Sequence, residues 1–268
     1  MIDNSAKHRR GLLIPLSALL PGVMLFTWLR FAPPGLAGKL WAIGYSVCHQ
    51  IASHSYIVGG VQLPLCARCT GLFLGAWITL TFLATRSRKC AFPKAKYRWM
   101  LLVILLAYAA DGLNSALFEI APSLSLYPPS NLLRLTTGVL MGIALGVLLT
   151  SLWNQILWKD GLDVPALNSI REWFILLAAG GSIVLMVNLG WNSLYYPLAL
   201  LSTAGVVILL SAVYTLLWTL GLKKENTLIT WTERPWIFLL GAGTAMVQIN
   251  LVDGLRLLLT HTWAGIAL

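Results

Sequence analysis

The stretch RSRKCAFPKAKYRWMLLVILLAYAADGLNSALFE, residues 86–119, decides the fold of this chain. Residues 86–98 carry six basic side chains and no acidic one, whereas residues 99–119 are largely apolar. Because the hydrocarbon core of a bilayer takes roughly 20 apolar residues in an α-helix, the apolar run predicts a transmembrane helix. The basic segment before it predicts a loop at the cytoplasmic end of that helix.

Apolar windows of similar length recur along the 268 residues, of which 58% are hydrophobic and only 10% charged. This composition excludes an ordinary soluble enzyme and a disordered chain. Seven windows are long enough to cross a bilayer, namely 11–32, 66–86, 99–119, 130–153, 173–190, 195–220 and 236–258. The sequence therefore predicts an all-α fold, a polytopic bundle of about seven transmembrane helices.

The net charge of +10 is carried mainly by short segments between the apolar windows. Such segments orient membrane helices, so we expect no nucleic-acid partner. Counting crossings from the cytoplasmic loop 86–98 places the N-terminus, Lys223 and Arg234 on the inside. The opposite loops, 119–130 and 191–196, contain no Lys or Arg. We therefore expect a cytoplasmic N-terminus and an extracytoplasmic C-terminus.

Residues 34–65 fall on the outside by this count. They include LAGKLWAIGYSVCHQI, residues 36–51, an apolar segment that is too short to span a bilayer. We predict an interfacial or re-entrant helix there. The first apolar window has no small-residue cleavage site before Arg30, so we expect a retained anchor and not a signal peptide.

Three of the four cysteines lie close together in the sequence: Cys48, followed by Cys66 and Cys69 in a Cys-Ala-Arg-Cys motif. The two thiolates of such a motif converge from one turn of chain, and a Cys/His pair upstream can complete a tetrahedral site. We therefore predict a site for zinc or another thiophilic metal, with His49 or His54 as the fourth ligand.

The same cysteines support two other interpretations. Cys66 precedes an apolar window, and a thiolate at the start of a helix is stabilised by unpaired backbone N–H groups, as in thiol oxidoreductases. A structural disulfide is also compatible with an oxidising extracytoplasmic side. The fourth cysteine, Cys90, stands alone in the basic loop and is expected to be a reduced thiol.

Charged residues inside the apolar windows are costly in a bilayer and are candidate functional groups. Counting 1.5 Å per residue places Asp111, Asp253, Arg134 and Arg68 at a similar level in the outer half of the membrane. We expect these four to form a polar pocket with a catalytic or binding role. The alternative is a purely structural role as ion pairs between Asp111 and Arg134 and between Asp253 and Arg256. Amide groups at comparable levels are those of Asn114, Asn131, Gln248 and Asn250.

Several of these residues fall into a known pattern, which consists of Cys48, His49, Gln50, Ser55, the run QLPLCARCTG at 62–71, Gly75, Asp111, Gly112, Asn131, Arg134, Thr137 and Gly138. The pattern resembles a family of small prokaryotic membrane proteins, domain of unknown function 2085. The likeness covers about residues 40–150 and implies an integral protein of the prokaryotic plasma membrane. It divides the chain into a family-like core at 1–153 and a three-span extension at 154–268 in the same bundle. Because the family usually has Arg at the position of His54, the resemblance favours His49 as the fourth ligand.

Four functions remain compatible with the sequence. The first is a metal site at the extracytoplasmic face, beside a pocket that binds or acts on a lipid headgroup or other anionic group. The second is a thiol-disulfide oxidoreductase linked to membrane quinone. The third and fourth are a transporter or lipid translocator, and a subunit of a homo-oligomer or larger membrane complex. Whether the protein is an enzyme stays open at this stage.

Overall fold

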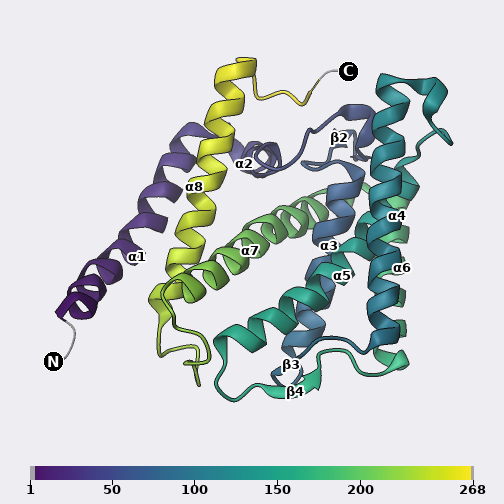
Figure 1. Ribbon diagram of the computed structural model, residues 1–268. Helices are drawn as coiled ribbons and strands as arrows, with labels where there is room; N and C mark the ends of the chain where they lie inside the picture. Colours follow the sequence, from purple (N-terminus) through teal and green to yellow (C-terminus); the bar gives the residue numbers. More distant parts are fainter. Residues whose placement is uncertain (1–3, 267–268) are drawn as a thin grey trace.

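The computed structural model describes residues 4–266, with side chains from residue 15 onward. This part of the chain folds into eight α-helices connected by short loops (Figure 1). They are α1 (Asn4–Phe31), α2 (Gly35–Tyr45), α3 (Ala67–Ala84), α4 (Ala95–Ile120), α5 (Asn131–Leu157), α6 (Ile170–Leu189), α7 (Tyr195–Gly221) and α8 (Pro235–Thr260). The all-α fold is confirmed.

Two small β-pairs and three 3-10 turns complete the secondary structure of the described residues. They are β1 (Ile57–Val58) with antiparallel β2 (Val61–Gln62), β3 (Lys89–Ala91) with parallel β4 (Leu162–Pro165), and η1 (Ala52–His54), η2 (Pro122–Leu124) and η3 (Asn192–Leu194). The β1–β2 turn consists of Gly59 and Gly60, both with positive φ, which is the backbone that a two-residue hairpin requires. This hairpin was not predicted from the sequence, although two adjacent glycines between valines are a recognised signal for it.

Six helices in the described residues, α3 to α8, are each long and apolar enough to cross a membrane. A seventh crossing depends on the second half of α1, Pro15–Phe31, together with α2, because these two are bent by 114° relative to each other. The bend follows from Pro33 and Pro34, which lie between the helices and fix the backbone in an extended form. The polytopic architecture is therefore confirmed, and α2 is the short helix expected within 36–51.

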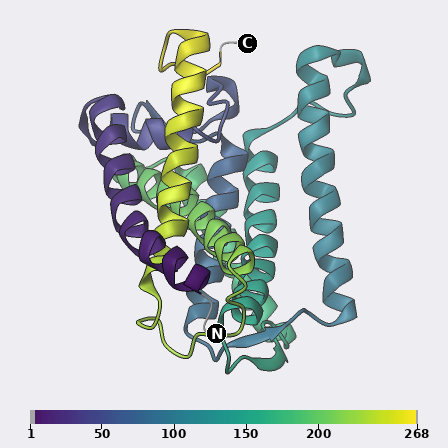
Figure 2. The same ribbon diagram turned by 60° about the vertical axis from the view of Figure 1, so that its left-hand side comes forward.

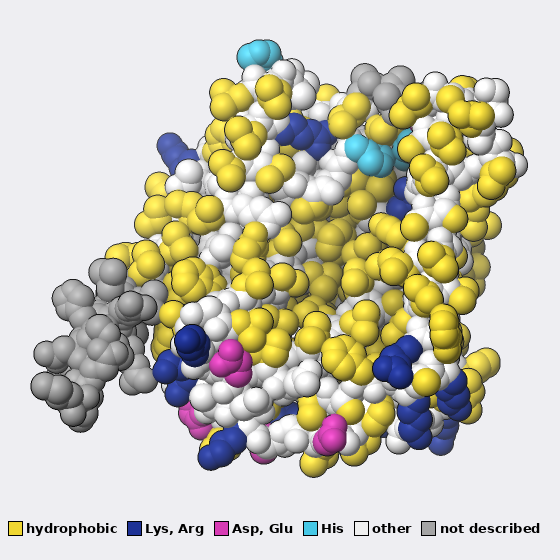
Figure 3. All heavy atoms as spheres, in the orientation of Figure 1, with side chains coloured by type: hydrophobic (Ala, Val, Ile, Leu, Met, Phe, Trp, Pro, Cys, Tyr) yellow, Lys and Arg dark blue, Asp and Glu magenta, His cyan; other side chains and the backbone are white. Residues whose placement is uncertain are grey.

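The loops gather at two ends of the bundle (Figures 1 and 2). At one end, called here the basic end, lie β3, β4 and the loops before α6 and α8. At the other, called here the cysteine end, lie α2, the β1–β2 hairpin and the start of α5. On the face shown in Figure 3 the band between the two ends is mainly hydrophobic, and Lys and Arg side chains gather at the basic end.

The helices α3 and α5 cross with their backbones in direct contact. A Cβ atom at Gly75 of α3 would lie 2.3 Å from the Val139 carbonyl oxygen, and one at Gly142 of α5 would lie 2.1 Å from the Leu72 carbonyl oxygen. Gly142 and Gly146 are four residues apart, a spacing of small residues that is typical of close helix packing. That packing takes place within the chain, because a Cβ at Gly146 would lie 2.6 Å from the Thr79 side chain of α3.

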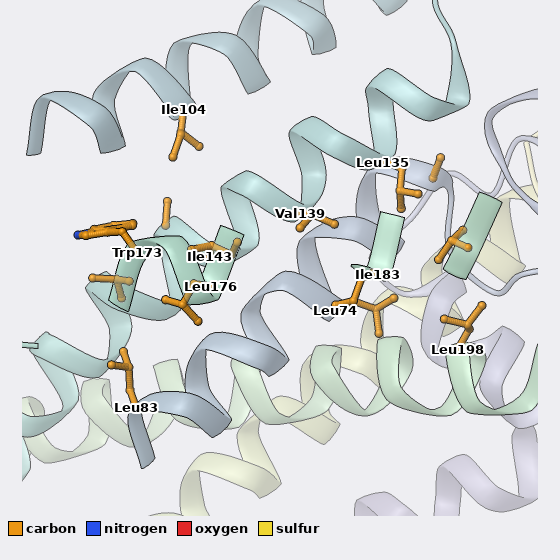
Figure 4. Packing of buried hydrophobic residues seen from close by; sticks show 14 of the residues in the cluster. Leu74, Leu83, Ile104, Leu135, Val139, Ile143, Trp173, Leu176, Ile183 and Leu198 are labelled. Atoms are coloured by element: carbon orange, nitrogen blue, oxygen red, sulfur yellow. The ribbon is translucent and has the colours of Figure 1, made fainter. Parts of the chain in front are cut away.

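The largest hydrophobic core surrounds this crossing (Figure 4). Leu74 of α3 and Val139 of α5 pack with Leu176 and Ile183 of α6, while Ile104 contributes from α4. The helix α4 lies at the edge of the bundle and packs mainly on α5 (Figure 2). The α3–α5 pair is thus the centre on which the other helices are arranged.

Replacing Gly75 by Ala places a methyl group against the Val139 carbonyl and forces α3 and α5 apart. We expect a loss of about 1–3 kcal/mol in the free energy of folding, measured as a lower thermal midpoint of the detergent-solubilised chain. Gly181→Ala on α6 is the matched control, because a Cβ there meets no atom within 4 Å. It should be neutral or slightly stabilising, since Ala favours the helix. Equal midpoints for the two variants would contradict the close crossing.

Candidate functional site

The structure brings the three clustered cysteines together at the cysteine end. The Sγ atoms of Cys48, Cys66 and Cys69 all lie within 4.8 Å of one another, and the first two side chains are buried. Cys48 lies in the loop after α2, Cys66 is the residue that precedes α3, and Cys69 is in the first turn of α3. The Cys66 backbone N–H donates to the Cys48 Sγ at 3.2 Å. Cys90 lies in β3, the strand after α3, at the basic end, and it is not part of this cluster.

The three thiols do not titrate alike. Hydrogen bonds from the thiols of Cys66 and Cys69, and from the Cys66 backbone N–H, lower the pKa of Cys48 to about 2. The same thiol hydrogen bond, in which Cys66 is the donor, raises the pKa of Cys66 to about 12. Cys48 is therefore the first thiolate of the cluster, held beside the N-terminal end of α3, where unpaired N–H groups favour negative charge.

The loop that carries Cys48 is held against the hairpin by Gln50. The backbone of Gln50 has φ of +55°, an unfavourable value for a residue with a side chain. Its Nε2 donates to the carbonyl oxygens of Pro64 at 2.8 Å and Trp41 at 2.9 Å. Gln62 of β2 donates in turn to the Gln50 carbonyl oxygen at 3.0 Å. These bonds connect the segment before the hairpin to the segment after it, which brings Cys48 to the motif 18 residues later.

Arg256 of α8 holds the same loop from the opposite side. Its Nη1 donates to the carbonyl oxygens of Tyr45 at 2.8 Å and Cys48 at 2.6 Å, and its Nη2 donates to the His49 carbonyl oxygen at 3.2 Å. The guanidinium also lies 3.7 Å from the centre of the Tyr45 ring. The expected ion pair between Arg256 and Asp253 is therefore absent among the described residues, and Arg256 is a positioning residue for Cys48.

Asp253 lies apart from the other three residues of the expected polar pocket. It is fully buried, its Oδ2 accepts from the Trp28 indole N–H at 3.2 Å, and its Oδ1 has no hydrogen-bond partner in the described part of the chain. The helix α8 packs on α1, α2 and α7, whereas Asp111 is on α4, which packs on α5. Depth in the membrane gives the level of a residue but not its side of the bundle. Two further polar residues of α8 also have partners outside this pocket. Gln248 accepts from the Tyr214 hydroxyl, and Asn250 donates to the Met24 carbonyl oxygen.

Asp111 pairs with Arg68, which corrects the expected pairing with Arg134. The Arg68 Nε donates to Asp111 Oδ2 at 3.2 Å, and its Nη2 donates to the same oxygen, to the Asp111 carbonyl at 3.1 Å and to Ser115 Oγ at 3.0 Å. The Tyr127 hydroxyl donates to the other carboxylate oxygen at 3.2 Å. Arg68 follows Cys66 by about half a helical turn, so its side chain points away from the cysteine and toward α4. The spacing of the Cys-Ala-Arg-Cys motif does not reveal which helix lies on that side.

Arg134 shares this pocket without an acidic partner of its own. Its side chain is buried, its Nη1 donates to Asn131 Oδ1 at 3.0 Å, and its Nε approaches Ser115 Oγ at 3.4 Å. No carboxylate lies within 4 Å of it among the described residues. Ser115 thus contacts both Arg68 and Arg134, and the pocket holds two guanidinium groups for one carboxylate.

The histidines considered as fourth ligand lie next to the cysteines but outside the group of three. His49 Nδ1 accepts from the Ile51 backbone N–H at 3.0 Å, and its ring packs edge-on against His54 at 5.3 Å. His54 Nε2 is 2.9 Å from Glu119 Oε1. Burial lowers the pKa of His49, and the positive charges of Arg68 and Arg134 lower it further. His49 is therefore neutral near pH 7, with its Nε2 unengaged among the described residues.

Residues 48–148 match the profile of the family described as "Predicted membrane protein (DUF2085)". This segment, called here the DUF2085 segment, is the part of the chain that is similar to the family. An uncharacterized protein of Methanocaldococcus jannaschii is 24% identical over 120 residues, which cover 45% of this chain and 72% of that protein. An uncharacterized protein of Methanothermobacter thermautotrophicus is 29% identical over 111 residues, 41% of this chain and 91% of that protein. No solved structure matches the chain.

The DUF2085 segment contains the three cysteines, Arg68, Asp111 and Arg134, but it excludes Asp253 and Arg256. The match confirms the resemblance of this segment, and the long apolar helices support a multi-pass membrane protein. The segment runs from the loop after α2 to late in α5, so it holds the glycine contact between α3 and α5 as well.

Asp111→Leu leaves two arginines in the pocket without a carboxylate, and we expect it to destabilise the fold by about 3–5 kcal/mol. Adding Arg68→Met removes the partner as well, so the double variant should be more stable than Asp111→Leu alone. Thermal midpoints in detergent measure both, with Asp163→Leu, at an exposed position, as the control for removing an acidic group. A double variant no more stable than the single one would contradict the Arg68–Asp111 pairing.

Arg256→Met keeps a long aliphatic side chain but removes the three hydrogen bonds to the Cys48 loop. Hydrogen bonds from a charged donor contribute about 1.5–3 kcal/mol each, so local opening should become at least about tenfold more frequent. The measurement is the rate of maleimide labelling of the cluster in a Cys90→Ser background after chelation. Arg30→Met, at an exposed position near the end of α1, is the control. Equal labelling rates in Arg256→Met and Arg30→Met would contradict the proposed positioning role of Arg256.

Proposed function

We propose that Cys48, Cys66 and Cys69 bind one thiophilic metal ion, with zinc as the first candidate, and that the neighbouring arginine pocket receives an anionic group. The observation that carries the proposal is the convergence of three Sγ atoms within 4.8 Å. Tetrahedral zinc with bonds of about 2.3 Å to sulfur needs sulfurs about 3.8 Å apart, which is compatible with three sulfurs that all lie within 4.8 Å of one another. Soft thiolates select zinc and related ions over magnesium or calcium.

Three thiolates leave the fourth position of a tetrahedral metal for another ligand. His49 is the preferred residue, because its ring is neutral and its Nε2 is unengaged, whereas His54 contacts Glu119. A water molecule or an oxygen of a bound group is the other occupant of that position. A site closed by His49 is structural, and a site left open can polarise a phosphate or carboxylate oxygen.

The proposal that the pocket binds an anionic group rests on the charges of its side chains. Arg68 and Arg134 face one carboxylate, Asp111, and the polar side chains of Ser115 and Asn131. A buried arginine without an acidic partner is costly in a membrane, and planar guanidinium groups suit carboxylate or phosphate. A lipid headgroup and a soluble phosphate share this chemistry.

The orientation is also part of the proposal. We infer that the basic end faces the cytoplasm, because the loop 86–98 carries six basic residues and short basic loops are retained inside. The cysteine cluster and the arginine pocket then lie near the extracytoplasmic face, within the prokaryotic plasma membrane.

Elemental analysis of the purified full chain, combined with thiol counting, tests the metal. We expect about one thiophilic ion per chain, lost in Cys48→Ser, Cys66→Ser and Cys69→Ser and retained in the control Cys90→Ser. His49→Ala should weaken metal retention during chelation more than His54→Ala does. A metal-free chain with three free thiols and unchanged stability contradicts the proposal. A disulfide between Cys66 and Cys69 without metal replaces it with the quinone-linked oxidoreductase.

The anionic group is tested separately on metal-loaded protein. We expect inorganic phosphate, or vesicles of phosphatidylglycerol, to raise the thermal midpoint of the wild type. Arg134→Met should keep the metal and lose this response, because its substitution leaves all three cysteines in place. A response to vesicles but not to phosphate assigns a lipid headgroup, and an Arg134→Met variant that responds like the wild type contradicts the pocket.

A further inference from the structure

A cavity of about 520 Å³ lies at the basic end, between the last turns of α3 and α5 and the facing parts of α7 and α8. This volume is within the range of sites that hold small organic ligands. Its interior is apolar, with Leu83, Leu149 and Ile208 among the lining residues. Leu80 is the lining residue of α3 that is nearest in sequence to the cysteine cluster, and it follows Cys69 by 11 residues, about 16 Å at 1.5 Å per residue, so the cavity is separate from the proposed metal site.

Aromatic rings form one wall of this cavity. The ring of Trp231 lies 4.6 Å from that of Trp158, 5.4 Å from that of Phe238 and 6.3 Å from that of Trp153. All four line the cavity. Tryptophan is enriched where a membrane meets water, because its ring is apolar and its N–H is polar. The aromatic wall therefore places the cavity at the boundary between lipid tails and headgroups.

Two arginines complete the lining, Arg86 and Arg88. The Arg86 side chain is 40% exposed and lies 3.5 Å from Glu172, which is also 3.9 Å from Lys89. Arg88 donates to Asp160 at 2.7 Å, and its guanidinium carbon lies over the Trp158 ring, 3.7 Å from the ring centre. Arg86 and Arg88 of the lining, together with the neighbouring Lys89, thus share two carboxylates, and Lys and Arg gather around this end of the molecule (Figure 3).

We propose that the cavity binds an anionic phospholipid, with an acyl chain in the apolar interior and the phosphate against Arg86 and Arg88. The apolar lining alone accepts any acyl chain. The excess positive charge at the rim adds the preference for an anionic headgroup, since basic pockets between transmembrane helices recognise such lipids. A zwitterionic headgroup gains less there, because its own ammonium group offsets the phosphate.

The test compares dioleoyl phosphatidylglycerol with dioleoyl phosphatidylcholine, which share their acyl chains, by native mass spectrometry of the full chain in detergent. We expect the wild type to retain phosphatidylglycerol preferentially. Each basic residue near the membrane surface contributes about 1 kcal/mol to anionic lipid binding, so Arg86→Gln with Arg88→Gln should weaken it about 30-fold. Lys94→Gln with Lys96→Gln is the matched control, because it removes the same charge from residues outside the cavity lining. It should change binding no more than about twofold.

A second variant tests the cavity independently of the double arginine variant, in case that variant does not fold. Ala212→Phe fills the cavity from α7 and should reduce the binding of both lipids, while the thermal midpoint without lipid stays near that of the wild type. Equal retention of the two lipids by the wild type overturns the proposal, as does equal loss in the arginine and lysine pairs. Recovery of a neutral isoprenoid quinone in place of phospholipid from the purified protein overturns it as well.

Discussion

The backbone contact between α3 and α5 is the constraint on which the site depends. A Cβ at Gly138 would lie 2.2 Å from the Arg68 carbonyl oxygen, so the two helices meet at the level of the arginine pocket. The side chains of Arg68 on α3 and Arg134 on α5 project from neighbouring faces of the two helices, and both contact Ser115. Like charges held this close repel unless an acid lies between them, which explains why Asp111 is buried beside them.

The cysteine cluster depends on parts of the chain that are distant in sequence. The β1–β2 hairpin reverses the chain between Cys48 and Cys66, and Gly265 and Ile266 pack against the loop that follows Cys48. The Ile266 backbone N–H donates to the His49 carbonyl oxygen at 2.9 Å, and a Cβ at Gly265 would lie 2.1 Å from the Gln50 carbonyl oxygen. These contacts, like those of Arg256, come from outside the DUF2085 segment. The C-terminal extension therefore supports the family segment directly.

Hydropathy predicted the helices because lipid imposes the same requirement on every spanning segment. It also predicts a level in the membrane for Asp111 and Asp253, which stays a prediction, but rotation about the bundle axis depends on helix packing. For that reason the partners of Asp111 and Arg256 were wrong, although the groups themselves were recognised. The convergence of Cys48 with Cys66 followed from metal-ligand spacing, whereas the hairpin that produces it was overlooked at Gly59 and Gly60. Local turn signals were thus informative where hydropathy was not.

Charge connects the two halves of the candidate site. A divalent ion bound by three thiolates carries a formal net charge of −1, and so does the metal-free cluster with a single thiolate at Cys48. The arginine pocket, with two guanidinium groups and Asp111, carries +1, which offsets the cluster in both states. If the proposed metal is bound, an anionic group that approaches its fourth position would meet a neutral surrounding instead of a negative one. This balance offsets part of the cost of burying Arg134 without an acidic partner, and a bound anionic group would offset more of it.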